Sequence, residues 1–331
     1  MSLLFRGATA CRNWLFDQGL KPSVKTGVPV LVVGNLIAGG AGKTPTVLAL
    51  VDLLQRQGWC VGLISRGYGR QTQGVRHVHP TSNALDVGDE PLLLARRAQV
   101  PVAVGRDRVQ AARSLLQAHP DVNLLISDDG LQHRSLHRDL QVLVFDERGI
   151  GNGWLLPAGP LRQPLPTACP PCTLVVYNAA QPTTPLPGHL GVRSLQGVVE
   201  CSRWRAGEAA RADALTQLAE RSQHEPIWAA AGIAQPHRFF DLLTKAGVRF
   251  QPLPLPDHFD FQANLPWPVG SVLIVTEKDA VKLTEPLLGQ AEVWVAPLDF
   301  HLDAAFAQAL KALMNSLSLY PPTTDHGSPT A

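Results

Sequence analysis

The chain has 331 residues, of which 45% are apolar and 17% are charged, and its net charge is +2. This length accommodates two domains, and the near-neutral charge excludes an electrostatic argument for a nucleic-acid partner. The charged fraction lies below the roughly 25% typical of soluble domains. That deficit suits a lipid-like ligand or a membrane surface, and it equally fits a Pro-, Ala- and Leu-rich composition without functional meaning.

The first segment, residues 3–16, is predicted to be a helix that mixes large apolar side chains with two arginines. The apolar run before Ala8-Thr9-Ala10 is three residues long, which is too short for the hydrophobic region of a signal peptide. Nowhere does the sequence approach the ~20 consecutive apolar residues of a spanning helix. The residues alone favour a helix packed on the protein's own core over a basic amphipathic helix in a bilayer surface.

Strands and helices alternate up to about residue 146. Short apolar runs typical of buried strands occur at 28–34, 60–65, 100–104, 122–127 and 140–146, and helical spacing occurs at 44–57, 91–97 and 106–118. This alternation predicts an α/β fold with a doubly wound parallel sheet, like that of P-loop NTPases. Ligands bind such sheets at the carboxyl ends of the strands, which is where the polar clusters of this chain fall.

The second half of the chain begins with a Gly- and Pro-rich stretch at 149–171, which predicts a boundary or hinge. A second α/β pattern follows, with strands that start near residues 173, 197, 226, 271 and 293. We expect the chain to be organised as a nucleotide-binding domain over 1–150, a smaller α/β domain over 151–300 that closes over the active site, a closing helix over 302–318 that packs back on the first domain, and a disordered tail over 319–331.

Five cysteines are scattered along the chain, at positions 11, 60, 169, 172 and 201. An odd, dispersed set is unlike the dense, even set of a small secreted disulfide scaffold. The pair in Cys169-Pro-Pro-Cys172 has the form of a redox or metal motif. It lacks a second such pair, and prolines flank it where a helix would have to begin, so we interpret it as incidental.

A glycine-rich segment joins the first predicted strand to the first predicted helix of the sheet, and it reads Gly39-Gly40-Ala41-Gly42-Lys43-Thr44. Backbone N–H groups of such a turn, at a helix N-terminus, wrap phosphate oxygens. Lys43 then reaches the β- and γ-phosphates, and the Thr44 hydroxyl supports Mg²⁺. The strict P-loop pattern is not met, because position 37 is Ile and Gly34 lies too far back, yet every physical element of a nucleoside triphosphate site is present.

Two carboxylates, Asp128 and Asp129, end the strand at 122–127. A polar strand-to-turn transition with Asp-Gly chemistry is one interpretation. Beside a phosphate loop, the stronger interpretation is that one aspartate serves Mg²⁺ and the other acts as a base or a further metal contact.

Seven further strings carry a resemblance, and they are SRGYGR at 65–70, GDEP at 88–91, GRDR at 105–108, DDGLQH at 128–133, LLPAGPLR at 155–162, DH at 257–258 and TEKDA at 276–280. In this order and spacing the chain resembles the tetraacyldisaccharide 4′-kinases of lipid A biosynthesis, from about residue 3 to about residue 315. The resemblance implies a kinase that uses ATP and Mg²⁺ to phosphorylate the 4′-hydroxyl of a tetraacylated glucosamine disaccharide 1-phosphate. It implies action at the cytoplasmic face of a Gram-negative inner membrane. We infer no obligate protein partner from the sequence.

The same resemblance assigns roles to individual residues. The family's catalytic pair falls on Asp89 and His258, with Lys43 beside the phosphates. The residues alone also permit Asp89 as a helix N-cap and His258 as an ordinary loop histidine. The family's N-terminal helix touches the bilayer, which turns the expectation for residues 3–16 toward an interfacial helix.

Three arginines in these strings, Arg66, Arg108 and Arg162, are candidates for phosphate contacts on the nucleotide or the substrate, because a guanidinium matches phosphate oxygens bidentately. Their plainer interpretation is solvated surface arginines. Tyr68 and Gln132 are expected in the wall of the active site. We interpret the pair Lys278-Asp279 as structural ion-pair residues near the hinge.

One departure from the family concerns position 163. Where the family usually reads L-R-E-P, this chain reads Leu161-Arg162-Gln163-Pro164. An amide replaces a carboxylate expected near the nucleotide, which leaves Asp128 and Asp129 as the main acidic metal contacts.

Two other classes of function share part of this pattern. A P-loop switch or partner-activating ATPase or GTPase also has the strand, the glycine-rich loop and the acidic pair. The chain lacks an [NT]-K-x-D base-reading motif, and Ala38 stands where the dimerising ATPases carry an extra lysine. A non-catalytic nucleotide-binding module is the third possibility, and it would need neither Asp89 nor His258.

Overall fold

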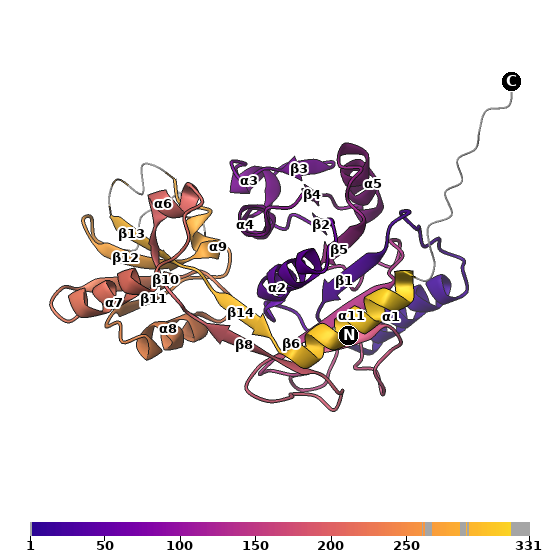
Figure 1. Cartoon of the computed structure of the whole chain (residues 1–331). Helices are drawn as coiled ribbons and strands as arrows, with labels where there is room; N and C mark the ends of the chain where they lie inside the picture. The colour runs from indigo at the N-terminus through magenta and orange to yellow at the C-terminus, as the bar shows by residue number, and fades with distance from the viewer. Residues whose placement is uncertain (1, 260, 262–266, 285–288, 290, 319–331) are drawn as a thin grey trace, which may run out of the picture.

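The structure, a computed structural model, describes residues 2–259, 261, 267–284, 289 and 291–318. Figure 1 shows two α/β parts joined by a pair of strands, with the N-terminal half of the chain in one part and much of the C-terminal half in the other. The predicted fold class, a large and mostly parallel sheet with a second smaller one, is confirmed. The predicted disordered tail at 319–331 lies outside the described residues.

Nine strands within the described residues form the large sheet, in the order β14-β8-β7-β6-β1-β5-β2-β4-β3. Their bounds are β1 (Val30–Gly34), β2 (Val61–Ser65), β3 (Arg76–Val78), β4 (Val102–Val104), β5 (Leu124–Asp128), β6 (Leu140–Asp146), β7 (Thr173–Asn178), β8 (His189–Ser194) and β14 (Asp299–Leu302). Strand β1 lies between β5 and β6, parallel to both, and all its residues are buried. A continuous run of apolar side chains suits a strand covered on both faces, so the loop after β1 emerges from the middle of the sheet.

The smaller sheet has the order β11-β10-β12-β13-β9. Its bounds are β9 (Val199–Glu200), β10 (Ile227–Ala231), β11 (Gln251–Pro254), β12 (Val272–Thr276) and β13 (Glu292–Ala296). The central strand, β12, is buried throughout and runs parallel to β10 and β13, whereas β9 is antiparallel to β13. The loops after β11 and β12 leave the same edge of this sheet, because both strands run parallel to β10.

The helices cover both sheets, with bounds α1 (Ser2–Asp17), α2 (Lys43–Arg56), α3 (Ala84–Val87), α4 (Asp89–Ala98), α5 (Arg108–Ala118), α6 (Cys201–Arg205), α7 (Ala212–Arg221), α8 (Pro236–Lys245), α9 (Glu277–Ala280) and α11 (Ala304–Ser318). Helix α2 buries Val47, Leu50, Val51 and Leu54, which share one face because they lie three or four residues apart. Helix α4 packs on α2 and on α9 of the smaller part, and one hydrophobic cluster continues across this contact. That contact brings the two parts together at the site.

The strand at 173–178 was expected to open the second α/β pattern, and this expectation is wrong. Strand β7 belongs to the large sheet, where it pairs in parallel with β6, and β8 and β14 extend the same sheet beyond β7. The chain passes into the smaller part after β8 and returns through β14 (Figure 1). An apolar run predicts a buried strand but not which sheet buries it. The division of the chain into domains at residue 150 stays a prediction.

Helix α1 lies against the large sheet's part at several points. Ser2 Oγ donates to the Leu155 carbonyl at 2.8 Å, and Asp17 pairs with Arg134 at 2.5 Å. Two of its apolar side chains are exposed to solvent, Leu4 by 74% and Trp14 by 54%. The helix therefore contacts the core and also exposes large apolar side chains. No helix in the described part of the chain is both long and apolar enough to cross a membrane.

Candidate active site

The segment predicted to bind phosphate forms a turn between β1 and α2. Gly39 and Gly42 have backbone φ angles of 89° and 87°, which residues with a Cβ rarely adopt. The side-chain amide of Asn35, which the sequence did not single out, donates to the Gly39 carbonyl at 3.1 Å. The residues from Gly39 to Thr44 thus lie where a buried strand runs into a helix N-terminus, an arrangement that presents backbone N–H groups to an anion.

Lys43 is the first residue of α2, and its side chain is 11% exposed. Its ammonium lies 3.5 Å from Asp129 Oδ1 and 3.4 Å from Asn35 Oδ1. Thr44 follows in the same helical turn. The lysine therefore reaches from the phosphate loop to the end of β5, where the two predicted carboxylates lie.

Asp128 is the last residue of β5, and Asp129 follows it. Strand β5 lies beside β1, with Asp128 in register with Val33. Burial raises the pKa of the Asp128 carboxyl to about 7; the charge of Glu90 adds to this rise, and Lys43 opposes it. Asp129 adopts a φ of 48°, an uncommon conformation for a residue with a side chain. Burial opposes its ionisation too, but Lys43 and Arg162 outweigh burial and lower the pKa of Asp129. The nearby cations thus outweigh burial at Asp129 but not at Asp128.

The environment of Asp128 fits a divalent cation. Its Oδ2 accepts from Ser65 Oγ at 3.3 Å, whereas its buried Oδ1 has no hydrogen-bond partner among the described residues. Mg²⁺ in phosphoryl-transfer sites is held by one or two carboxylates together with substrate phosphates. A buried, unsatisfied carboxylate oxygen on the strand beside β1, which leads into the phosphate loop, meets that requirement.

Asp89 and His258 come from the two different parts of the molecule and meet. Asp89 is the first residue of α4 and is buried; its Oδ1 accepts from the Glu90 backbone N–H at 2.8 Å. Its Oδ2 lies 2.8 Å from Nδ1 of His258, which follows β11 and has a φ of 59°. Strained backbone of this kind clusters at functional sites. Tyr68, which the sequence predicted in the wall of the active site, lies beside them, and the centroid of its ring is 5.2 Å from that of the His258 ring.

Lys278 organises the surroundings of this pair. Its ammonium lies 3.1 Å from both Glu90 and Asp257, and 3.4 Å from His258 Nε2. Burial opposes its charge, but the three nearby carboxylates outweigh burial and raise its pKa. Asp279 instead accepts from Thr276 and the Gly232 N–H inside the smaller part. The sequence grouped these two residues, and the structure separates a lysine at the site from a buried structural aspartate.

The three candidate arginines lie in different environments. Arg162 donates to Asp129 at 3.1 Å and to Gln132 Oε1 at 3.4 Å, whereas Arg66 is exposed. Arg108 is fully buried, so the interpretation of a solvated surface arginine is wrong for it. Its Nη1 donates to the Gly105 carbonyl, and its Nε and Nη2 have no hydrogen-bond partner among the described residues. Burial lowers the pKa of Arg108 to about 10, against the charges of Asp128 and Asp129.

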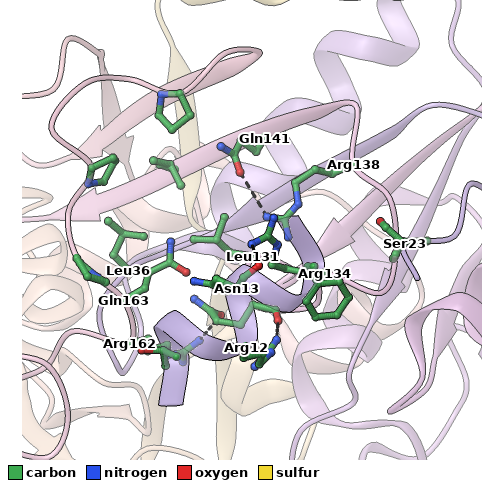
Figure 2. Close-up of a pocket in the computed structure, with 18 of the residues that line it drawn as sticks. Arg12, Asn13, Ser23, Leu36, Leu131, Arg134, Arg138, Gln141, Arg162 and Gln163 are labelled. Atoms are coloured by element: carbon green, nitrogen blue, oxygen red, sulfur yellow. Dashed lines mark hydrogen bonds between the residues drawn. The ribbon is translucent and has the colours of Figure 1, made fainter. Parts of the chain in front are cut away.

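A pocket of about 470 Å³ opens between α1 and the loops after β5 and β6. Figure 2 shows four arginines around it, together with amides and a few leucines. The arginines are Arg12, Arg134, Arg138 and Arg162. Gln163, the position that departs from the family pattern, also lines this pocket. The sequence pointed to Arg162 alone, since the others carry no motif and converge only through the packing of α1.

Similar proteins support one family. The sequence profile described as Tetraacyldisaccharide-1-P 4′-kinase matches residues 1–315. A tetraacyldisaccharide 4′-kinase of Leptothrix cholodnii is 52% identical over 320 residues, covering 95% of this chain and 90% of the relative. One of Methylibium petroleiphilum is 51% identical over 324 residues, with 96% and 89% covered. The crystal structure of LpxK from Aquifex aeolicus in complex with ATP is similar with a TM-score of 0.76 at 29% identity, and 96% of each chain is covered.

Proposed function

The chain belongs to the tetraacyldisaccharide-1-P 4′-kinase family, and from that membership we propose how its residues divide the work of the reaction. The protein is an ATP-dependent kinase that phosphorylates the 4′-hydroxyl of a tetraacylated glucosamine disaccharide 1-phosphate. We assign the ATP phosphates to residues 39–44. The observation that carries this assignment is the contact between Lys43 and the end of β5, which joins a glycine-rich loop to two carboxylates.

Thr44, Asp128 and Asp129 are the residues that would hold Mg²⁺, which neutralises phosphate charge when it is bound. Lys43 adds a positive charge at the β- and γ-phosphates. Arg162 shares Asp129 with Lys43 and also lines the arginine-rich pocket. It is therefore suited to contact either the transferred phosphoryl group or an anionic group of the acceptor.

The Asp89–His258 pair is assigned the role of general base for the acceptor hydroxyl. His258 Nδ1 donates to the Asp89 carboxylate, and the Lys278 ammonium lies beside His258 Nε2. The pair therefore carries one negative charge, which the positive charge of Lys278 stabilises. In phosphoryl transfer most of the catalysis is positioning and charge neutralisation, and the proton of the attacking hydroxyl passes to the pair. Family membership favours this catalytic use over a P-loop switch, which would not need the pair.

The test is transfer of labelled γ-phosphate from ATP to a tetraacylated disaccharide 1-phosphate in detergent micelles. We expect phosphorylated lipid from the wild-type protein and none above background from Lys43→Ala. ATP binding or hydrolysis without labelled lipid would contradict the kinase assignment and move the switch function to first place. A matched reaction with an acceptor that lacks the 4′-hydroxyl controls for transfer to another position.

The acceptor is a lipid, and we propose that α1 lies on the cytoplasmic face of the Gram-negative inner membrane as a peripheral anchor. Leu4 and Trp14 expose large apolar surface, and the exposed Arg6 adds positive charge to the same helix. Such a helix binds by burying its apolar side chains at the headgroup boundary, helped by attraction to anionic lipids. No protein partner is needed for this association.

Replacing both Leu4 and Trp14 by glutamate is expected to move the protein from the pellet to the supernatant when it is sedimented with anionic vesicles. Deleting residues 2–17 tests the same helix but also removes Arg12, which contacts Gln132. Val269→Glu, at an equally exposed apolar position of the smaller part, serves as the matched control. Unchanged co-sedimentation of the double variant would overturn the membrane role of α1.

A further inference from the structure

The carbonyl oxygens of the phosphate loop are held from behind by side chains of the large sheet. Backbone N–H groups can face a phosphate only if the carbonyls turn away from it. Arg148 Nη2 donates to the Gly40 carbonyl at 2.9 Å, and its Nη1 donates to the Ala38 carbonyl at 3.4 Å. Asn178 Nδ2 donates to the Ala41 carbonyl at 3.1 Å. Three carbonyls of one loop are therefore fixed by two side chains.

Arg148 is itself fixed by a fully buried carboxylate at the end of β6. Its Nη2 lies 2.8 Å from Asp146 Oδ2, and its Nε lies 3.0 Å from the same oxygen. The Arg148 backbone N–H donates to Asp146 Oδ1 at 3.0 Å. A buried charge persists only when it is paired and hydrogen-bonded in this way, so Asp146 holds the guanidinium at the loop.

The start of α8, in the smaller part, contacts the residues behind the loop at two points, the Asp146 carboxylate and the backbone of Asn178. Gln235 Nε2 donates to Asp146 Oδ2 at 2.8 Å, and Arg238 Nη1 donates to the Asn178 carbonyl at 3.4 Å. Ala234 packs on Gly40 so closely that a Cβ there would lie 3.2 Å from the alanine methyl. Two chains of contact thus run in parallel from α8 to the carbonyls of the phosphate loop.

We propose that Asp146, Arg148 and Asn178 are positioning residues that shape the phosphate loop, and that Gln235 and Arg238 make this shape depend on where the smaller part lies. The inference rests on the assignment of the loop as the ATP site.

Arg148→Ala is expected to weaken binding of a non-hydrolysable ATP analogue by about tenfold or more, since two charged hydrogen bonds to the loop are lost. Arg148→Lys keeps the charge beside Asp146 and is expected to recover part of the affinity. Gln235→Ala is expected to raise the KM for ATP by about threefold and to leave kcat and the KM for the lipid acceptor unchanged. Calorimetric titration and steady-state kinetics measure these quantities.

Gln223→Ala is the matched control, because Gln223 is exposed at the end of α7 and bonds only neighbouring groups of the smaller part. A lower melting temperature with unchanged nucleotide affinity in Arg148→Ala and Arg148→Lys would reduce these residues to a structural role and overturn the inference. An affinity loss in Arg148→Ala together with an unchanged KM for ATP in Gln235→Ala would overturn the link to α8. A wild-type protein that fails to bind the analogue would contradict the assignment of the ATP site itself, so the two failures are distinguishable.

Discussion

Replacing Asp89 by asparagine is expected to lower kcat by about 10²–10⁴-fold, the usual contribution of a general base, and to leave ATP affinity unchanged. Asparagine has the same shape, and its oxygen can still accept from the Glu90 N–H as Asp89 Oδ1 does. It offers His258 no negative charge and takes up no proton. The substitution therefore removes the base and keeps the start of α4. Lipid phosphorylation gives kcat, and calorimetric titration gives the ATP affinity.

Asp86→Asn provides the control, since Asp86 lies three residues earlier on α3 and is exposed. It is expected to leave both quantities unchanged. Full turnover in Asp89→Asn would refute the assignment of the pair as the base. Loss of nucleotide binding in both Asp89 and His258 variants would instead favour a switch-like or structural role for the contact.

The pH profile of the same variant gives an independent signature. The hydrogen bond to Asp89 raises the pKa of His258, although burial and Lys278 act to lower it. Burial acts to raise the pKa of Asp89, but the His258 hydrogen bond and Lys278 outweigh it and lower that pKa. The wild-type rate is expected to fall as pH drops through the raised pKa of His258, because the pair is then protonated. In Asp89→Asn the raising contact is gone, so the residual rate should inflect at a lower pH.

Sequence patterns located the buried centre of the large sheet but not its edges. Strands β1 and β5 are buried along their whole length, and each begins with a run of apolar residues that is visible without a structure. Strand β8 is partly exposed, and β14 is four residues long, so neither carries a strong pattern. Strand β7 was visible and yet assigned to the wrong sheet, because sheet membership depends on long-range pairing that local composition does not encode.

The candidate site divides in the same way. Lys43, Asp128 and Asp129 follow motifs whose spacing reflects their chemistry, so the sequence identified them together. The donors behind the phosphate loop have no such spacing. Asn178 and Arg148 reach the loop only because β6 lies next to β1 and β7 lies next to β6 in the sheet, an order that the chain sequence does not state. Resemblance supplied Asp89 and His258, and the structure adds the contact between them across 169 positions of sequence.

Lys43→Ala is expected to lower kcat/KM for ATP by about 10²–10³-fold or more, the cost of removing one preorganised group that stabilises developing charge. The lysine is nearly buried, and it stands between the phosphate loop and Asp129. Its removal also takes away the first of the cations that lower the pKa of Asp129, so that pKa should rise and the metal contact should weaken with it. Measuring kcat/KM at several Mg²⁺ concentrations separates these two effects.

Lys311→Ala is the control for loss of one positive charge, because Lys311 is an exposed lysine on α11.

The variants Asp89→Asn and Lys43→Ala should differ in kind, because the first removes proton acceptance and the second removes phosphate binding. ATP affinity should survive the first change and fall with the second. If both variants lost activity with unchanged affinity, Lys43 would act on the transferred group alone, and the phosphate loop would bind nucleotide chiefly through its backbone N–H groups. If neither variant lost activity, residues 39–44 would not be the site of phosphoryl transfer, and another part of the chain would have to bind ATP and carry out the reaction.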